Sequence, residues 1–191
     1  MTPPQRPSEA TAAAHWLLDA PGLPSPVRLS VRSHSIAITL AGVPIYVFDP
    51  SGRLYEAFVD GKNYLRGLDD RVMEKWGRSQ IGVAKRRRVS PDEAHALYVS
   101  AYDAAGRLRD ALASGRARVL EHEPEGATLE QALLALETVC DWDAEKLHAD
   151  GRKFLSIYKP VSILPPDQYM ALVLQATEGC SHNRCTFCSF Y

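Results

Sequence analysis

Residues 27–32 alternate apolar with polar, which is the pattern of a half-buried β-strand. Three further runs, 36–40, 43–48 and 54–59, are rich in apolar residues and are also predicted to be strands. The last two runs flank residues 49–52, Asp-Pro-Ser-Gly, whose residue types suit a tight turn. This part of the chain therefore predicts a small antiparallel sheet that includes a hairpin.

The period changes to that of an amphipathic helix after residue 90. Residues 90–93, Ser-Pro-Asp-Glu, form a strong helix start: the serine can cap the helix, the proline suits the first helical position, and the glutamate can reach back to the cap. Apolar residues recur at helical spacing as far as Leu112, and Gly115 follows as a stop signal. A long helix is predicted between these two points.

Two further helices are predicted downstream. Residues 128–131, Thr-Leu-Glu-Gln, form a second capping box and open an amphipathic segment that extends to Val139. Asp143 is expected to cap a third helix that runs to about Tyr158. Gly151 lies inside that helix, where its low helix propensity marks a weak point.

The chain divides into three parts. In residues 1–26, a proline-rich start over 1–7 is expected to be disordered, Ser8 is expected to cap a short helix through Ala20, and a proline- and glycine-containing linker follows. Residues 27–160 are expected to form an accessory α+β domain, a small antiparallel sheet plus several helices, with one or two helical turns over 69–76. Residues 161–191 form the third part, which contains a long apolar run and three of the four cysteines.

Charge and hydropathy narrow the class of protein. The formal net charge is −1, so no overall field points to a nucleic acid or an anionic membrane. No stretch approaches the roughly 20 apolar residues that cross a bilayer, and the N-terminus matches neither a secretory signal nor a transit peptide. We therefore expect a cytoplasmic protein without a membrane partner.

A nearly continuous apolar run covers residues 169–176. A run of this length reads as a strand buried on both faces, as in parallel sheets. It leads directly into residues 177–180, Thr-Glu-Gly-Cys. The C-terminal ends of buried parallel strands are where α/β folds and barrels place their chemistry, so the segment after the run is the first place to look for a site.

Three of the four cysteines lie in that segment. Cys180, Cys185 and Cys188 are spaced C-x4-C-x2-C, whereas Cys140 stands alone. Clustered cysteines in a cytosolic chain are more often ligands or catalysts than disulfide partners. Soft thiolates select iron–sulfur clusters, zinc or copper(I). Three thiolates on a [4Fe–4S] cluster would leave one iron open for reaction, whereas four would make an electron carrier.

This loop resembles the cluster-binding motif of the radical S-adenosylmethionine (radical SAM) superfamily, which spaces three cysteines C-x3-C-x2-C with an aromatic residue just before the last. Phe187 fills the aromatic position. The Gly-Cys opening and the Cys-Thr-Phe-Cys ending over residues 179–188 resemble one subgroup of the superfamily. The first gap holds four residues here instead of three. The likeness covers about the last 25 residues.

The resemblance implies a fold, a ligand set and an activity. It makes run 169–176 the first strand of a partial (β/α)6 barrel, with the cluster loop after it. It implies that Cys180, Cys185 and Cys188 bind three irons of a [4Fe–4S] cluster, that the fourth iron binds S-adenosylmethionine, and that Phe187 packs beside the cluster or the adenine. The implied reaction is reductive cleavage of S-adenosylmethionine to a 5′-deoxyadenosyl radical, which abstracts hydrogen from a substrate that the sequence does not identify. A flavodoxin- or ferredoxin-type protein is the implied reductant.

The chain stops three residues after Cys188, before the remaining barrel elements that the superfamily uses. We therefore expect an N-terminal portion of such an enzyme, with the barrel truncated and no turnover by itself. Two other interpretations stay open. One is a binding module with a structural zinc loop, in which His182 is a fourth ligand, together with a basic patch. The other is an inactive remnant.

Several single features have simple interpretations. Cys140, on a predicted amphipathic helix, is expected to be a small buried apolar residue, the alternative being a distant fourth ligand. Residues 85–88, Lys-Arg-Arg-Arg, are expected to be a solvated surface; binding of RNA phosphates is the alternative. The pair Asp69-Asp70 suits a helix cap. Outside the cysteine loop the histidines are scattered singly and make no ligand spacing. They are His15, His34, His95, His122 and His148.

Overall fold

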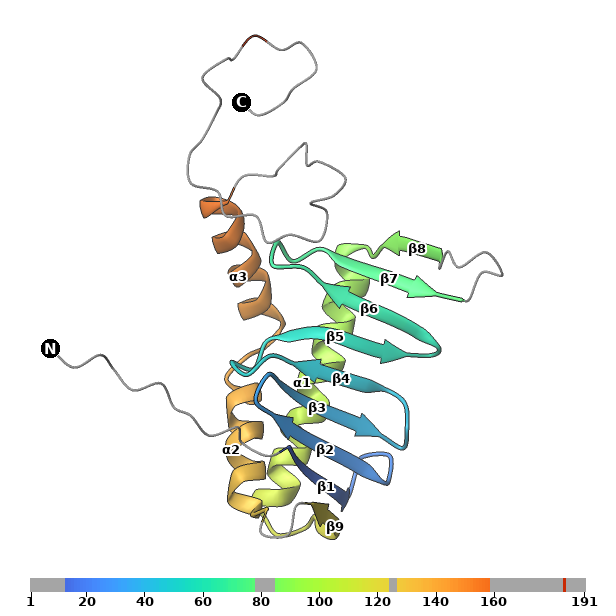
Figure 1. The fold of residues 1–191 in the computed structure, drawn as a ribbon, viewed down its shortest axis with the longest axis vertical. Helices are drawn as coiled ribbons and strands as arrows, with labels where there is room; N and C mark the ends of the chain where they lie inside the picture. The colour runs from blue at the N-terminus through green and yellow to red at the C-terminus, as the bar shows by residue number, and fades with distance from the viewer. Residues whose placement is uncertain (1–12, 78–84, 124–126, 159–183, 185–191) are drawn as a thin grey trace, which may run out of the picture.

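The computed structural model describes residues 13–77, 85–123, 127–158 and 184. Within these residues, nine strands form one antiparallel sheet and three helices pack on it (Figure 1). The strands are β1 (Ala14–Asp19), β2 (Val27–Arg32), β3 (Ser35–Leu40), β4 (Ile45–Phe48), β5 (Leu54–Val59), β6 (Lys62–Arg66), β7 (Val72–Trp76), β8 (Lys85–Arg88) and β9 (Arg118–Glu123). The helices are α1 (Pro91–Ala113), α2 (Leu129–Cys140) and α3 (Ala144–Ile157).

The sheet is a meander with one exception. Its order is β8-β7-β6-β5-β4-β3-β2-β1-β9, so strands β1 to β8 each pair with their neighbours along the chain. Strand β9 instead pairs with β1, because α1 runs behind the sheet from β8 to the opposite edge (Figure 1). The α+β class and the antiparallel sheet are thus confirmed for the described residues, although the sheet has more strands than the sequence predicted.

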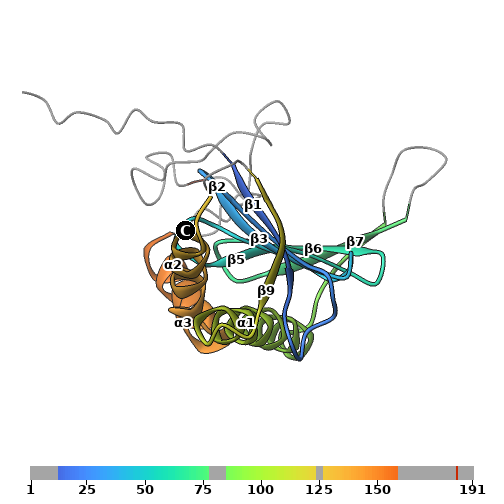
Figure 2. The same cartoon turned by 90° about the horizontal axis from the view of Figure 1, so that it is seen from below.

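The hydrophobic core lies between one face of the sheet and the helices, which gather on that side (Figure 2). Each fully buried large apolar side chain contributes about 1.5–3 kcal/mol relative to its exposed state. The sheet supplies Trp16, Leu29, Ile38, Phe48 and Leu54, and the helices supply Tyr98, Leu108, Leu136 and Leu147. No helix in the described part of the chain is both long and apolar enough to span a membrane.

The helix predicted to end at Ala20 is wrong over residues 14–19, which form strand β1. Trp16 and Leu18 point into the core, while His15 and Leu17 lie on the other face, which is the period of a strand. Pairing with β2 on one side and β9 on the other supplies the backbone hydrogen bonds. These partners are distant in the sequence, so a local cap signal could not reveal them.

The helical turns expected over residues 69–76 are also wrong, because Val72–Trp76 is strand β7. Val72 and Glu74 face inward in alternation, and the strand pairs with both β6 and β8. The basic run 85–88 forms strand β8, and all four of its residues are exposed, in agreement with a solvated surface. Strand β9, which is mostly polar, was not predicted.

The three helix predictions are confirmed, with their caps. Ser90 and Thr128 each form a reciprocal capping box with the residue three positions later. Asp143 accepts a hydrogen bond from the backbone N–H of Lys146 at the start of α3. Local side-chain chemistry fixes these ends, which is why they could be predicted from the sequence.

The start of α1 is also joined to the sheet by charge. The guanidinium of Arg87 donates two hydrogen bonds to the Glu93 carboxylate, at 2.8 and 2.9 Å, and its Nη2 lies 2.6 Å from Oε2 of the buried Glu74. Lys62 contacts the other oxygen of Glu74 at 2.7 Å. The hydrogen bonds from Arg87, followed by those from Ser90, hold the pKa of Glu93 well below its usual range.

Glu93→Gln is expected to lower the thermal midpoint at pH 7, because glutamine keeps the capping geometry and loses the charge. A depressed pKa stabilises the fold above the unfolded value, about 4.3, and this contribution is lost as the pH falls through the folded value. The difference between variant and parent should therefore shrink below about pH 4. Thermal melts of the variant and the parent across a pH series measure this difference in midpoint. Asp92→Asn, which removes a charge in the same helical turn, is the control. A difference that stays constant from neutral to acid pH would contradict the assignment.

Candidate functional site

The predicted cluster ligands Cys180, Cys185 and Cys188, together with Phe187 and His182, lie outside the described residues. Arg184 is the one residue of the loop that the structure describes, and it is exposed. The remaining cysteine, Cys140, ends α2 as a free, half-buried thiol. Burial raises the pKa of this thiol above its ordinary value. That shift disfavours the thiolate, the form that binds metals.

Asp70 is the centre of a polar cluster in the described domain. Its Oδ1 accepts hydrogen bonds from Nε of Arg66 at 2.7 Å and from the hydroxyl of Tyr98 at 3.0 Å. Its Oδ2 lies 2.6 Å from Nδ1 of His148. These partners come from β6, α1 and α3, so one carboxylate joins the sheet to two helices. Asp70 itself has a φ of 65°, a left-handed conformation that aspartate tolerates better than most residues.

Arg66 is the positive partner in this cluster and is nearly inaccessible, with 4% of its side chain exposed. Besides Asp70, it donates a hydrogen bond from Nη2 to the backbone carbonyl of Leu147 at 2.9 Å. Asp150 on α3 lies 3.8 Å from the same nitrogen. Burial, together with the charge of Asp70, raises the pKa of Tyr98 far above its ordinary value, so its hydroxyl remains a donor at all physiological pH values.

Gly151 lets α3 approach the cluster. A Cβ at this position would lie 2.4 Å from Cβ of Asp70 and 3.2 Å from its backbone nitrogen. His148 and Gly151 are three residues apart and therefore share one face of α3. The glycine that appears as a weak point in the helix pattern is thus a contact position, where any side chain would push α3 away from Asp70.

His148 continues the cluster to the surface through His95 on α1. Nε2 of His148 lies 3.1 Å from Nδ1 of His95, the ring centroids are 5.4 Å apart, and the planes differ by 10°. Rings stacked face to face could not combine that centroid separation with so short a nitrogen contact, so the rings lie end to end, nearly coplanar. With the Nδ1 proton of His148 directed at Asp70, its Nε2 accepts a hydrogen bond from His95.

This arrangement can pass a proton between the Asp70 carboxylate and the surface. In a catalytic Asp-His-nucleophile triad, the nucleophile would lie at Nε2 of the histidine, here His148. In this cluster His95 occupies that position. A cavity of about 230 Å³ adjoins the cluster, between the start of α1, α3 and the β6–β7 loop. Ser90 lines it, yet its hydroxyl is engaged with Glu93 as the helix cap. The cluster therefore joins α1 and α3 to the sheet and places no free nucleophile beside His148 among the described residues.

Local sequence patterns did not reveal this cluster. Asp69-Asp70 was interpreted as a helix cap, which is wrong, because the pair lies in the β6–β7 loop and caps no described helix. His95 and His148 looked isolated, but the fold brings them together across 53 positions. The available signal was Gly151, since a glycine inside a helix often marks a close approach.

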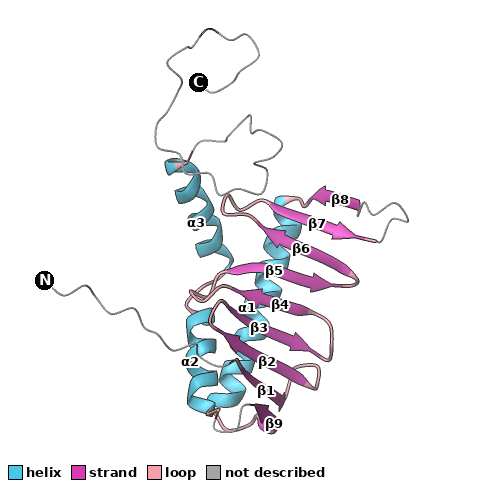
Figure 3. Ribbon diagram, viewed as in Figure 1, coloured by secondary structure: helices cyan, strands magenta, loops and turns pink. Residues whose placement is uncertain are grey.

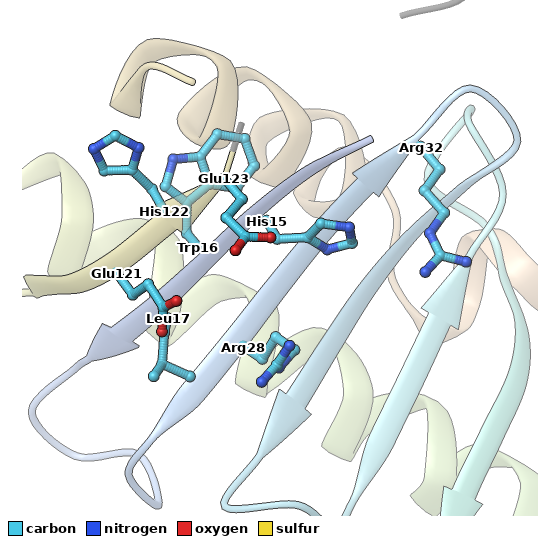
Figure 4. Close-up of a pocket in the computed structure, with 8 residues that line it drawn as sticks. All are labelled: His15, Trp16, Leu17, Arg28, Arg32, Glu121, His122 and Glu123. Atoms are coloured by element: carbon cyan, nitrogen blue, oxygen red, sulfur yellow. The ribbon is translucent and has the colours of Figure 1, made fainter. Parts of the chain in front are cut away.

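A second hollow lies on the face of the sheet away from the helices, over β9, β1 and β2. Its volume is about 320 Å³, and Figure 4 shows the side chains that line it. Arg28 and Arg32 come from β2, and Glu121 and Glu123 come from the edge strand β9. Nδ1 of His15 lies 2.9 Å from the Ser30 hydroxyl. The hollow is open and carries both signs of charge, so it has no single preferred type of ligand.

Among the described residues, no group of three or more His, Cys, Asp or Glu side chains is arranged to hold a metal ion. Comparisons with protein-family models, with curated proteins and with solved structures found no match to this chain. Function is therefore inferred from the residues of the chain itself.

Proposed function

We propose that this chain carries the cluster loop of a radical SAM enzyme, preceded by an accessory α+β domain over the described residues. Cys180, Cys185 and Cys188 would be the protein ligands of a [4Fe–4S] cluster, and Phe187 would pack beside the cluster or the adenine of S-adenosylmethionine. The single observation that carries the proposal is the spacing C-x4-C-x2-C with an aromatic residue before the last cysteine, directly after an apolar run.

The donor set fits the proposed cofactor. Three thiolates are soft ligands of the kind that iron–sulfur clusters require, and three ligands leave one iron for a small molecule. The fourth cysteine, Cys140, is half-buried on α2, and burial raises the pKa of its thiol, which disfavours the thiolate in the absence of a metal. When bound and reduced, the cluster supplies the electron that cleaves the sulfonium of S-adenosylmethionine.

The chain's own residues would hold and shield the reacting groups. The three cysteines fix the cluster at the end of the proposed first barrel strand, residues 169–176. Phe187, between two of the ligands, would exclude water from one side of the cluster. The accessory domain would anchor this segment through α3, which ends at Ile157 and is tied to the sheet by the Asp70 cluster.

The first test is metal analysis after anaerobic reconstitution of the full chain. Cys185→Ala is expected to lose more than about 90% of the bound iron and sulfide, because two thiolates hold a [4Fe–4S] cluster poorly. Cys140→Ala is the matched control and should keep the iron content of the parent. Iron and sulfide assays with a visible spectrum measure both variants, and a change in the spectrum of the reduced cluster on adding S-adenosylmethionine tests the open iron.

The outcomes separate the alternatives. Stoichiometric zinc without a visible band would replace the proposal with the structural zinc loop, and His182→Ala would then be expected to weaken zinc binding. Full iron retention in Cys185→Ala, or loss in Cys140→Ala, would contradict the ligand assignment. A cluster that does not respond to S-adenosylmethionine would leave an iron–sulfur protein of another class.

A further inference from the structure

All three helices pack on one face of the nine-stranded sheet, and the other face is covered by no described element (Figure 3). The strand register identifies which side chains lie on that outer face. One row across the sheet runs Leu17, Arg28, Thr39, Ile45, Phe58, Asn63, Lys75 and Arg86. The adjacent row runs His15, Ser30, Ala37, Val47, Glu56, Leu65, Met73 and Arg88.

Most side chains in the middle of the outer face are apolar; two polar exceptions, Glu56 and Asn63, are hydrogen-bonded to each other at 2.9 Å. We call six side chains there the outer apolar patch: Ala37, Ile45, Val47, Phe58, Leu65 and Met73. None of them belongs to the hydrophobic core on the helix side, and Phe58 is 36% exposed. An antiparallel sheet with one solvated face normally carries polar residues there. A contiguous apolar patch instead marks a contact surface.

The two edge strands carry opposite charges on the outer face. At one end, Glu121 and Glu123 project from β9, opposite Leu17 and His15 of β1 in the register. At the other end, Lys75 of β7 and both Arg86 and Arg88 of β8 lie on the same face. The central strand of the nine, β4, carries Ile45 and Val47 between these ends. The outer face therefore has an apolar centre between an acidic edge strand, β9, and a basic edge strand, β8, with Arg28 and Arg32 of β2 beside the acidic edge.

We propose that this face binds a second copy of the chain, sheet against sheet, about a two-fold axis parallel to the strands and centred on β4. Such an axis reverses the strand order of the second copy, so that β9 of each copy lies over β8 of the other. Glu121 then faces Arg86 and Glu123 faces Arg88, because the members of each pair lie in the same row, and His15 faces Met73. The outer apolar patches meet at the centre, as in an isologous interface, where one surface is complementary to itself.

The charges also exclude the alternative two-fold axis. An axis across the strands would keep the strand order, so β8 would face β8 and four arginines would meet. Like charges facing each other oppose association, whereas the proposed arrangement pairs opposite charges at both ends.

The charged ends provide the main test, because they lie on exposed edge strands and their replacement leaves the core intact. In sedimentation equilibrium of the full chain, Arg86→Glu with Arg88→Glu is expected to raise the dimer Kd by about tenfold or more. Glu121→Arg with Glu123→Arg should do the same. All four changes in one chain restore opposite charges at both ends, so that variant should recover the Kd of the parent.

The apolar centre provides the second test. Val47→Asp would place an uncompensated charge at the two-fold axis and should raise the dimer Kd by about a hundredfold. Leu134→Asp is the matched control, because Leu134 on α2 is 63% exposed on the helix side, and it should leave the Kd unchanged. Circular dichroism and thermal melts verify that each variant is folded.

Three results would overturn the proposal. A parent chain that stays monomeric at every accessible concentration would mean that something other than a second copy covers the outer face, such as a segment of the same chain. A dimer that persists with unchanged Kd in Val47→Asp, or that dissociates in Leu134→Asp, would place the interface elsewhere. A fourfold variant that does not recover affinity would exclude the β8–β9 charge pairing.

Discussion

Replacing Asp70 by alanine is expected to destabilise the fold by about 3–5 kcal/mol, because it leaves the buried Arg66 guanidinium without its closest counter-ion. The same change removes the acceptor of the Tyr98 hydroxyl and the partner of His148. A loss of this size is a large part of the 5–15 kcal/mol that stabilises a typical domain. Urea unfolding of the parent and the variant, followed by circular dichroism, measures it.

Two companion variants test the cause of that loss. Asp69→Ala removes the neighbouring carboxylate, which pairs with Arg71 near the surface, and should cost only about 0.5–1 kcal/mol. Asp70→Asn keeps an acceptor oxygen and a residue that tolerates the left-handed backbone, so it should recover part of the stability lost in Asp70→Ala. Equal effects of Asp69→Ala and Asp70→Ala would show that the cluster does not join α1 and α3 to the sheet.

The second large effect is expected for Gly151→Ala. In an exposed helix this substitution stabilises, since alanine has the higher helix propensity by about 1 kcal/mol. Here the new methyl group would lie 2.4 Å from Cβ of Asp70, a distance that forces either α3 or the β6–β7 loop to move. Overpacking of this kind typically costs 1–3 kcal/mol. We therefore expect a net loss of about 2 kcal/mol, again measured by urea unfolding.

Gly106→Ala on α1 is the natural control, because a Cβ there would meet no atom within 4 Å. It should stabilise the protein by up to about 1 kcal/mol. The two changes are chemically identical and both lie inside helices, so opposite signs would isolate the contact with Asp70. Stabilisation by Gly151→Ala would mean that α3 does not pack closely on the β6–β7 loop.

The parts of the fold that the sequence predicted are those set by local chemistry. The helices α1, α2 and α3 begin at side-chain caps that act within three residues. The strands β2 to β5 are runs rich in apolar residues and are joined by short turns such as residues 49–52. In each case the signal and the structure it specifies lie in the same few residues, so no knowledge of the tertiary structure was needed.

The parts that could not be predicted depend on partners far along the chain. Strand β9 is mostly polar and is a strand because β1, about 100 residues earlier, offers it an edge. Segment 14–19 contains good helix formers, yet pairing on both sides makes it a strand. Hydrogen-bonding partners at such separations leave no local signature.

The polar cluster was missed for the same reason. Tyr98 and His148 contact Asp70 across 28 and 78 positions, and no spacing rule links residues so far apart. The cysteine loop differs from the polar cluster, because its three proposed ligands lie within nine residues. Such a motif can be identified from the sequence without knowledge of the fold. Its assignment depends on the metal analysis of Cys185→Ala, because the loop lies outside the described residues.

The length of α1 and the width of the sheet are related. The helix follows β8 at one edge of the sheet and precedes β9 at the other edge, so its length must match the width of the sheet. Its 23 residues measure about 35 Å, and nine strands at their usual spacing span about 38 Å. A related chain with one more hairpin would need about six or seven more residues in this helix for β9 to reach β1. Sheet width and helix length in this architecture can therefore change only together.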